Sequence, residues 1–440
     1  MSTKNATDTK PYDDTHRVVV IGSGYAGIHA VCELVKRAKS NDNLEIVLLS
    51  NTDHLLYVTM IYEVVAGNLA PSSVRQSVRT MIEEDQIHFL QGIVDQADFD
   101  NQTINYLPKD SSVSGSNQDK EITISYDYLI SSIGSETDFH NTPGAAENAY
   151  TLKTLADAQT LKNKLINHFE AASMESDIHQ QQELLHFVVV GGGPTGVTLA
   201  AKIADLFNHE MATAFPELIG SALITILEGS DRLLTGLDSW FAERAYAALK
   251  KKQYVNVVTN RYVTNVQSDG VSVDDAFISS KCVIWVAGVQ AREFRITAQK
   301  SVLLHEQTRR IYVTEALHTE NYPNVFVAGD QCWVDRGVEG TYPMRAQFAV
   351  RQGKQAAANV IHSIRSQPLK DFYWKDKGLV VSLGKGHTYA QVGSLKFSGL
   401  LATMAYKSIY LMSTIGVRAK LRAMLEWGMN IFLPRDVSEL

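Results

Sequence analysis

The feature that most constrains this chain is a glycine-rich turn that occurs twice. In the first copy, residues 17–30 (RVVVIGSGYAGIHA), four β-branched residues run into Gly22, Gly24 and Gly27. A buried strand, a tight turn and then a helix leave unpaired backbone N–H groups facing the turn, which suits a pyrophosphate. Gly22 allows the turn, Gly24 the approach of the ligand, and Gly27 close packing of helix on strand. The pattern predicts a dinucleotide-binding fold.

The second copy is FVVVGGGPTGVTLA, residues 187–200, with Gly191, Gly193 and Gly196 at the same spacing. The next predicted strand ends at Glu228. A carboxylate at this place can accept both ribose hydroxyls of an adenosine and would repel a 2′-phosphate. We therefore expect the second copy to bind NADH rather than NADPH.

In the first copy the corresponding strand, 44–49, ends at Ser50, where an acid is usual. We expect the ribose contact there to be a weaker hydroxyl bond or to come from elsewhere. Two nucleotide folds predict two nucleotides, and a hydride carrier with a resident flavin is the simplest pairing.

Two further strand ends favour a flavin. The apolar run NVFVAGD, 324–330, ends in Gly329 and Asp330, which places a carboxylate beside backbone that can meet the ribityl chain. A strand within 126–135 ends near Gly134, a second glycine at which backbone can meet a cofactor. The first domain is thus predicted to be discontinuous.

The predicted fold class is α/β, with two Rossmann-like dinucleotide-binding domains, the second inserted in the first, and a C-terminal amphipathic helical membrane-binding region. Residues 153–170 have helical spacing, a Gln-rich loop is expected at 176–183, and a polar hairpin tip at 108–120. The expected ranges are a disordered tail (1–15), a FAD-binding domain (16–152 and 293–370), a NADH-binding domain (153–292) and the C-terminal region (371–440).

Composition narrows the classes of function. The 440 residues contain 41 Lys and Arg against 48 Asp and Glu, a formal net charge of −7. This argues against a general nucleic-acid binder, which carries a basic surface. Cys32, Cys282 and Cys332 lie far apart and form no CxxC or metal-ligand spacing. We expect no dithiol motif, no metal site and a reducing compartment.

The C-terminal stretch gathers positive charge. Residues 377–425 contain no Asp or Glu but seven basic residues: Lys377, Lys385, Lys396, Lys407, Arg418, Lys420 and Arg422. The stretch 397–417 carries too many polar groups, with a central Lys, for a bilayer span. Two helices lying in an anionic membrane interface fit better. The alternative is a pair of core or dimer-interface helices.

At helical spacing each of these helices has one apolar face. On the first it comprises Phe397, Leu400, Leu401, Met404, Leu411, Met412 and Ile415. On the second it comprises Val417, Leu421, Met424, Leu425, Ile431 and Phe432. Tyr406, Tyr410 and Trp427 are either interfacial anchors or packed side chains.

In this order, the motifs resemble the type II NADH:quinone oxidoreductases, non-proton-pumping members of the FAD/NAD(P)-dependent pyridine nucleotide-disulfide oxidoreductase superfamily. The resemblance spans the chain from about Arg17 to the C-terminus. Its segments are VVVIGSGYAGIHA (18–30), YDYLISSIGSETDFHNTPG (126–144), VVVGGGPTGVTLA (188–200), ILEGSDRLL (226–234), VIWVAGV (283–289), NVFVAGDQC (324–332) and RAQFAVRQG (345–353).

The resemblance implies two cofactors and a place for the quinone. FAD would be held by Gly22, Gly24, Gly27, Gly134, Gly329 and Asp330, and NADH by Gly191, Gly193, Gly196, Glu228 and Gly288. Ala346 and Gln347 would lie beside the flavin, next to the quinone entrance.

The chain departs from the family pattern around the acceptor. Thr198 stands where the family commonly has Glu, so protons must reach the quinone through water or another group. Arg351 replaces the second Gln of the AQxAxQ motif, Arg345 replaces a small polar residue and Thr59 a frequent proline. Arg351 or Arg345 could stabilise negative charge on the reduced quinone. The alternative is that either arginine pairs with a local carboxylate.

The predicted function is hydride transfer from NADH to FAD, then transfer of two electrons to a membrane quinone near Gln347 and Arg351, without proton pumping. We expect a peripheral protein on the cytoplasmic face of the cell membrane, with a homodimer as a candidate assembly. The alternatives are a FAD/NADH reductase with another acceptor, or a redox sensor similar to apoptosis-inducing factor. Sulfide chemistry would need paired cysteines, and only Cys332 could face a flavin.

Overall fold

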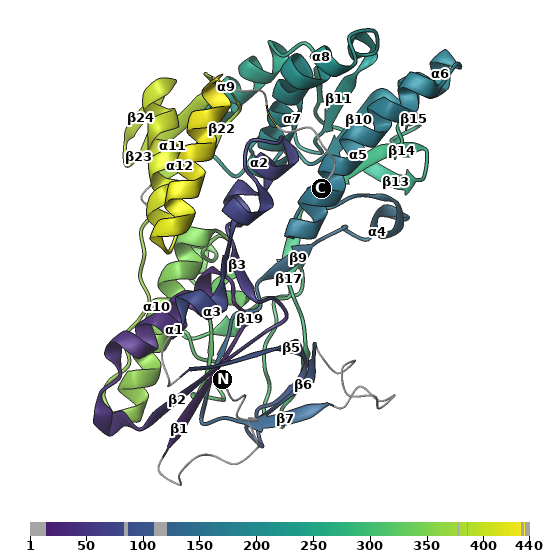
Figure 1. Ribbon diagram of the computed structural model, residues 1–440. Coiled ribbons are helices and arrows are strands. Elements are labelled where there is room, and N and C mark those ends of the chain that lie inside the picture. Colours follow the sequence, from purple (N-terminus) through teal and green to yellow (C-terminus); the bar gives the residue numbers. More distant parts are fainter. Residues whose placement is uncertain are drawn as a thin grey trace, which may run out of the picture. The chain divides into compact units, whose positions relative to one another are not determined.

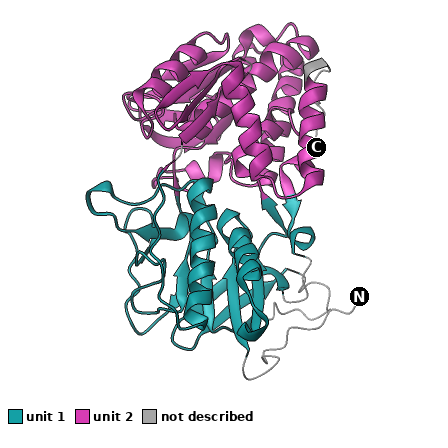
Figure 2. Ribbon diagram, turned by 90° about the vertical axis from the view of Figure 1, so that its left-hand side faces the viewer, with its two compact units in different colours: residues 1–55, 76–136, 290–375 teal, residues 56–75, 137–289, 376–440 magenta. Residues whose placement is uncertain are grey.

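The computed structural model describes residues 15–82, 87–109, 121–376, 378–384, 386–432 and Arg435. The chain divides into two compact units, coloured separately in Figure 2. Unit 1 comprises residues 1–55, 76–136 and 290–375, and unit 2 comprises 56–75, 137–289 and 376–440. The predicted tail before Thr15, and the predicted hairpin tip from residue 110 onward, lie outside the described residues.

Unit 1 is built on a sheet with strand order β20-β8-β1-β2-β5-β6-β7, whose first five strands are parallel. Val19, Ile21, Val47 and Leu49 point into one buried cluster beneath it. The strands of this sheet are β1 (His16–Ile21), β2 (Leu44–Ser50), β5 (Ile87–Asp98), β6 (Thr103–Pro108), β7 (Ile122–Ser125), β8 (Tyr128–Ser131), β20 (Val325–Val327) and β18 (Arg295–Thr297), which pairs with β5. The strands β19 (Ile311–Val313) and β21 (Cys332–Val334) pair with each other in a separate small sheet.

Two long helices of unit 1 lie side by side, α1 (Tyr25–Arg37) and α10 (Ala346–Ile364), as Figure 1 shows. They approach closely at Gly353, where a β-carbon would lie 2.1 Å from the Ala26 carbonyl oxygen. The short helix α3 (Val78–Met81) also belongs to this unit. The close contact brings the start of α10 towards the glycine turn before α1.

Unit 2 has a parallel sheet with strand order β12-β11-β10-β16 and an antiparallel sheet of β13, β14 and β15. The strands are β10 (His186–Val190), β11 (Leu223–Leu227), β12 (Val255–Val258), β13 (Val263–Gln267), β14 (Gly270–Val273), β15 (Ala276–Ser279) and β16 (Cys282–Trp285). The helices before the C-terminal part are α2 (Ile61–Val65), α4 (Ala145–Asn148), α5 (Leu155–Met174), α6 (Ile178–Leu185), α7 (Pro194–Leu206), α8 (Ala212–Ala214) and α9 (Ser239–Lys250). The two Rossmann-like sheets confirm the predicted fold class.

Short strands mark the places where the chain passes between the units. They are β3 (His54–Leu56), β4 (Arg75–Ser77), β9 (Ser135–Thr137) and β17 (Val289–Ala291). Residues 56–75 group with unit 2 because α2 packs against α5 and α7. The units thus differ from the predicted ranges, which placed 16–152 in the first domain and 371–440 in a separate region.

The predicted loop at 176–183 is wrong, because residues 178–185 form α6. The Asp177 carboxylate accepts hydrogen bonds from the amides of His179 and Gln180 and so caps this helix. In the sequence, Asp177 before this polar segment was the signal for the start of a helix, because aspartate is a preferred N-cap residue. The predicted helix at 153–170 is α5, which begins with a capping box formed by Thr154 and Asp157.

The C-terminal part begins with an antiparallel sheet of β22 (Gly378–Ser382), β23 (Thr388–Val392) and β24 (Leu395–Ser398). Helices α11 (Leu400–Ser413) and α12 (Val417–Phe432) follow. Phe397, predicted on the first helix, instead belongs to β24, because Gly399 turns the chain with φ +74°. Within the described ranges, no helix combines the length and apolarity that a bilayer crossing requires.

Candidate functional site

The first glycine turn has the stereochemistry that its sequence predicts. Gly22 has φ +99°, and a β-carbon there would lie 2.4 Å from the Ser132 carbonyl oxygen. A β-carbon on Gly27 would lie 1.8 Å from the Gly22 carbonyl oxygen. At Gly24, by contrast, no described heavy atom lies within 4 Å of that position. The middle glycine therefore opens the N-terminus of α1 to a ligand, which fits a pyrophosphate.

The ends of β8 and β20 bring the other first-domain candidates together. The Ser135 hydroxyl donates to the Asp330 carboxylate at 2.7 Å, which joins the segment after Gly134 to the segment after Gly329. Gly134 and Gly329 both have positive φ, 80° and 78°. The segments that carry Gly134, Gly329 and Asp330 thus lie together within unit 1.

Sequence reasoning missed two glutamines that hold these strand ends. The Gln352 amide oxygen accepts the Gly329 N–H at 2.9 Å, and Gln352 is fully buried in α10. The Gln331 amide oxygen accepts the Ser131 hydroxyl at 2.8 Å and the Ile133 N–H at 3.1 Å. The only signal was their place in two motifs, since contacts between distant segments are invisible in a single sequence.

Ser50 supports the glycine turn from inside. It is 4 % exposed, and its hydroxyl accepts the Ser23 N–H at 3.2 Å and bonds the Ser23 hydroxyl at 2.9 Å. Of the two expectations for the first ribose, a hydroxyl bond from Ser50 or a contact from elsewhere, this burial favours the second.

The second turn repeats the geometry in unit 2. Gly191 has φ +113°, and a β-carbon there would lie 2.6 Å from the Ala287 Cα. On Gly196 it would lie 1.9 Å from the Gly191 carbonyl oxygen, whereas around Gly193 the space is open as far as the described atoms extend. Pro194 then starts α7. The second turn therefore also exposes a helix N-terminus.

Glu228 lies at the end of β11 against this turn. Its carboxylate accepts the Gly192 N–H at 2.7 Å and the Ser230 N–H at 2.8 Å. These bonds fix the carboxylate beside the glycine turn, as an adenosine ribose requires. Gly288 has a packing role, since a β-carbon there would lie 2.4 Å from the His140 Nε2 atom.

The start of α10 carries the predicted acceptor-site residues. Arg345 occupies the N-cap position of this helix without a capping bond from its side chain, and Ala346 and Gln347 lie in the first turn. The Arg351 guanidinium donates to the Gln347 carbonyl oxygen at 2.7 Å and lies 3.7 Å from the centre of the Trp374 ring. Burial lowers its pKa. The partners observed for Arg351 are the Trp374 ring and the Gln347 carbonyl oxygen, and neither group carries a charge that would neutralise the guanidinium. The alternative expected a carboxylate partner.

The buried cysteines are unsuited to thiolate chemistry. Cys282 and Cys332 are fully buried, and burial raises the pKa of each thiol to about 12. Only the thiolate is a nucleophile, so neither reacts readily near neutral pH. This speaks against the alternative in which Cys332 works beside a flavin.

The outer faces of α11 and α12 are apolar and exposed. They carry Leu400, Leu401, Met404, Ile409, Met412, Val417, Leu421, Met424, Leu425 and Met429. Leu411 and Ile415, predicted on the first face, are half-buried, and the side chains of Ile431 and Phe432 lie outside the described set. The alternative of two core helices is wrong for these faces.

The aromatic residues of this region pack inwards. Tyr410 is buried and donates to the Ser73 carbonyl oxygen at 2.7 Å, and its ring contacts that of buried Trp427. The Tyr406 hydroxyl bonds Glu63 at 3.2 Å. Of the two alternatives left open for these residues, packing is therefore correct and interfacial anchoring is wrong.

The basic residues of this region are used unequally. Lys396 pairs with Asp238 at 2.8 Å, and Lys407 lies over the Trp427 ring at 5.0 Å. Arg418 on α12 is exposed, with Lys420 and Arg422 partly exposed on the same helix. Lys377 and Lys385 lie outside the described residues. Positive charge near the apolar faces thus comes mainly from α12.

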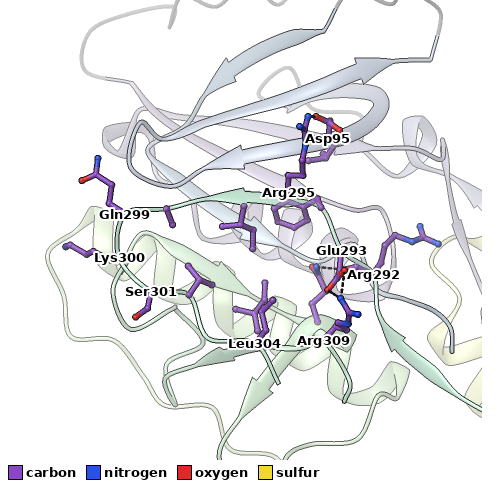
Figure 3. Close-up of a pocket in the computed structure, with 16 residues that line it drawn as sticks. Asp95, Arg292, Glu293, Arg295, Gln299, Lys300, Ser301, Leu304 and Arg309 are labelled. Carbon is purple, nitrogen blue, oxygen red and sulfur yellow. Dashed lines mark hydrogen bonds and ion pairs between the residues drawn. The ribbon is translucent and has the colours of Figure 1, made fainter. Parts of the chain in front are cut away.

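Unit 1 also contains a pocket that the sequence did not predict (Figure 3). Its volume is about 830 Å³. The Glu293 and Arg309 side chains point toward each other and pair at 2.9 Å, and Arg295 pairs with Asp95. Phe294, Ile296, Val302 and Leu304 contribute apolar lining. Of the two glutamines described above, Gln331 lines it.

Comparison with known proteins identifies the family. A model of the pyridine nucleotide-disulphide oxidoreductases matches residues 16–353. The type II NADH:quinone oxidoreductase Ndh of Mycobacterium tuberculosis (strain ATCC 25618 / H37Rv) is 30% identical over 431 residues, covering 96% of this chain and 89% of that protein. The chain is a member of the type II NADH:quinone oxidoreductases. This confirms the resemblance.

Further similarity supports the assignment. The type II NADH:quinone oxidoreductase NdhA of the same organism is 29% identical over 428 residues, covering 94% of this chain and 87% of that protein. The solved structure of NDH2 from Plasmodium falciparum in complex with NADH aligns with a TM-score of 0.86 at 17% identity, covering 96% of this chain and all of that one. The latter shows that the fold is shared.

Proposed function

We propose that the protein oxidises NADH and reduces a membrane quinone by two electrons through FAD, without pumping protons. The net reaction is NADH + H⁺ + quinone → NAD⁺ + quinol. The observation that carries the proposal is the pair of glycine turns. In each turn the first and third glycines leave no room for a β-carbon, and the middle glycine leaves the N-terminus of the following helix open.

FAD is proposed to lie on the first turn, between the two parts of a discontinuous domain. The N-terminus of α1 at Gly24 would hold the pyrophosphate, and the Asp330 carboxylate would accept hydrogen bonds from hydroxyl groups of the ribityl chain. Gly134 and Gly329 would let backbone approach the cofactor. When bound, the flavin accepts a hydride and releases electrons to a second substrate.

NADH is proposed to lie on the second turn. The N-terminus of α7 at Gly193 would bind its pyrophosphate, and Glu228 would accept both ribose hydroxyls. Because Gly192 and Ser230 already orient the carboxylate, a 2′-phosphate would meet a fixed negative charge. We therefore expect NADH to be preferred over NADPH.

The quinone is proposed to bind near Ala346, Gln347 and Arg351, with Arg345 close by in the chain. Arg351 keeps a positive charge that stacking on Trp374 orients without neutralising. A fixed cation at this place would stabilise negative charge on the quinone as it is reduced.

We propose that the apolar faces of α11 and α12 dock on the cytoplasmic surface of the cell membrane. Met404 is 58 % exposed and Met412 82 % exposed, and such faces are unusual on a soluble surface. Basic residues of α12 would add attraction to anionic lipid. The cysteines are free thiols, which is usual in a reducing compartment.

Vesicle binding tests the docking. We expect Met404→Glu to lower the affinity for anionic vesicles, measured by co-sedimentation, about tenfold, because burying a methionine side chain contributes roughly 1.5–3 kcal/mol. Met174→Glu is the matched control, because Met174 is an exposed methionine on α5. A different result would assign the face to a homodimer. In that case Met404→Glu binds vesicles as the unmodified protein does, and light scattering shows a dimer of the unmodified protein that the substitution dissociates.

The activity is tested on the purified full chain. Steady-state NADH oxidation is measured with ubiquinone, menaquinone or no added quinone, each with and without anionic liposomes. We expect flavin-coloured protein and quinone-dependent turnover. Colourless protein that takes up no flavin would contradict the proposal, and a long-lived charge-transfer absorption with negligible turnover would favour the redox sensor.

A further inference from the structure

An exposed aromatic ring in unit 2 lies beside Glu228 and has no role in the sites described so far. Tyr262 lies between β12 and β13 and is 68 % exposed. A β-carbon on Gly229 would lie 2.4 Å from the Tyr262 Cε1 atom, 2.8 Å from its Cδ1 atom and 2.9 Å from its Cζ atom. Three adjacent ring atoms are thus almost equally distant, whereas an approach to the ring edge would leave the outer two distinctly further away. The tyrosine ring therefore presents its face to the residue that follows Glu228.

This contact accounts for a glycine at position 229. Gly229 does not have the positive φ that reserves a backbone position for glycine. A β-carbon there would overlap the Tyr262 ring, so any other residue would push the ring away. Gly229 thus provides a flat backbone support for one face of the ring, while most of the remaining ring surface is exposed.

The segment that carries Tyr262 is tied to the segment that carries Glu228. The Arg261 N–H donates to the Glu228 carbonyl oxygen at 3.1 Å. The Asn260 N–H donates to the Ser230 carbonyl oxygen at 2.8 Å. These two backbone bonds hold the ring next to the carboxylate that is proposed to bind the ribose of NADH.

The order of the strands puts Tyr262 where the base of a bound dinucleotide would lie. Strands β10, β11 and β12 are parallel neighbours in this order. The glycine turn proposed for the pyrophosphate follows β10, Glu228 follows β11, and the loop with Tyr262 follows β12. Neighbouring strands lie about 4.8 Å apart, and a dinucleotide extends across the carboxyl ends of parallel strands. Because the ribose lies between the pyrophosphate and the base, the base would lie beyond Glu228, on the side of Tyr262.

A single exposed tyrosine is ordinary on a protein surface and needs no function of its own. Tyr246 on α9, for example, is 45 % exposed. Tyr262 differs because its ring rests on Gly229 and leaves its other side open at the place expected for a flat base. Aromatic side chains bind nucleobases by stacking, since every base has a π-face.

We propose that the adenine base of NADH stacks on the Tyr262 ring, with Gly229 supporting the ring from behind. This rests on the proposed function. The adenine takes no part in hydride transfer, so Tyr262 is a binding residue that contacts the half of the substrate that does not react. Such an interaction has the same strength in the ground state and the transition state, and it lowers KM without changing kcat.

Reduced nicotinamide mononucleotide separates stacking from a structural role, because it carries the reacting ring and no adenosine. The full-length flavin-loaded protein is assayed with a short-chain ubiquinone and either NADH or the mononucleotide. We expect Tyr262→Ala to raise the KM for NADH about tenfold, as loss of a stacking side chain does, and to change kcat less than about twofold. The kcat/KM for the mononucleotide should stay within about twofold. Calorimetric titration with ADP-ribose should show a loss of affinity of about tenfold.

Three variants serve as controls. Tyr262→Phe keeps the ring and should keep the KM for NADH within about twofold, because stacking needs no hydroxyl. Gly229→Ala should raise this KM while the protein stays folded, since its β-carbon displaces only the exposed end of the Tyr262 side chain. Tyr246→Ala is the matched control, because it removes an exposed tyrosine of the same unit and should change neither the KM nor the affinity for ADP-ribose.

Two results would overturn this role of Tyr262. One is a Tyr262→Ala variant that binds ADP-ribose and NADH as tightly as the unmodified protein. The other is an equal loss of kcat/KM with NADH and with the mononucleotide, which would indicate damage to the fold. If the unmodified protein neither oxidises NADH nor binds ADP-ribose, the proposed function itself fails, so the two failures are distinguishable.

Discussion

The glycines of the first turn allow a prediction that separates folding from ligand binding. Gly27→Ala would place a β-carbon 1.8 Å from the Gly22 carbonyl oxygen and 2.8 Å from the Ser132 hydroxyl. Carbon–oxygen contacts below about 3 Å are not tolerated in a close-packed interior. Because the nearest atom, the Gly22 carbonyl oxygen, belongs to the backbone and cannot rotate away, α1 must shift by about 1 Å to accommodate the methyl group.

Gly24→Ala meets a different environment. No heavy atom of the described residues lies within 4 Å of its β-carbon, and φ is −75°, which any residue adopts. Alanine there should leave the fold unchanged but intrude where the pyrophosphate approaches. The two variants add the same methyl group to the same turn, so each is a control for the other.

Overpacking of this kind destabilises by about 1–3 kcal/mol, and a backbone clash belongs at the upper end. For a unit of this size, 2–3 kcal/mol corresponds to a fall in Tm of about 4–12 °C. We expect Gly27→Ala to show that fall and to bind little flavin. Gly24→Ala should keep the Tm of the flavin-free protein while its affinity for FAD falls at least about tenfold, or 1.4 kcal/mol.

Differential scanning calorimetry of flavin-free protein and titration with FAD measure both quantities. If Gly27→Ala melts within about 1 °C of the unmodified protein and takes up FAD normally, Gly27 is not needed for packing. If Gly24→Ala lowers the Tm as much as Gly27→Ala does, the middle glycine serves packing and does not open the turn to a ligand.

Three further predictions concern single side chains. Glu228→Gln should raise the KM for NADH about tenfold and reduce the preference of the enzyme for NADH over NADPH. The reason is that an uncharged amide accepts hydrogen bonds from the ribose hydroxyls poorly and does not repel a 2′-phosphate. An unchanged ratio of kcat/KM for NADH to kcat/KM for NADPH would contradict this. Arg351→Gln should lower quinone kcat about tenfold or more with the KM for NADH unchanged, and equal quinone turnover would remove the proposed role. Arg365 binds both carboxylate oxygens of Asp42 and lowers the pKa of that carboxyl. The stabilisation by this pair is therefore fully present above the unfolded pKa of about 4 and is lost as pH falls through the folded pKa. Chemical denaturation should show Asp42→Asn destabilised at pH 7, with the difference from the unmodified protein shrinking as the pH is lowered below about 4.

Local patterns were predicted well because their causes are local. The strand, turn and helix around Gly22 and Gly191 are each specified by contiguous residues, and the three glycine roles follow from their spacing. The mistaken loop at 176–183 was also a local question, since the Asp177 cap was readable in the chain. Phe397 was placed on a helix because apolar spacing alone does not reveal that Gly399 separates a strand from a helix.

Side-chain partners could not be predicted in the same way. Burial of Ser50, Tyr410 and Trp427 depends on which distant segment covers each one, and the Gln352 contact with Gly329 joins residues 23 positions apart. The sequence offered no way to choose between anchoring and packing for the aromatic residues. The structure decided for packing, because Ser73 and Glu63 supply their hydrogen-bond partners.

By itself, the sequence determined the fold class, the two dinucleotide turns and the amphipathic C-terminal helices, because backbone stereochemistry and residue periodicity act over a few neighbouring positions. The tertiary structure alone decided that the Tyr262 ring lies over Gly229, and that Arg351 stacks on Trp374. Such meetings depend on how segments far apart in the chain pack together. A buried charge acquires its chemistry from the partners that this packing brings within hydrogen-bonding distance.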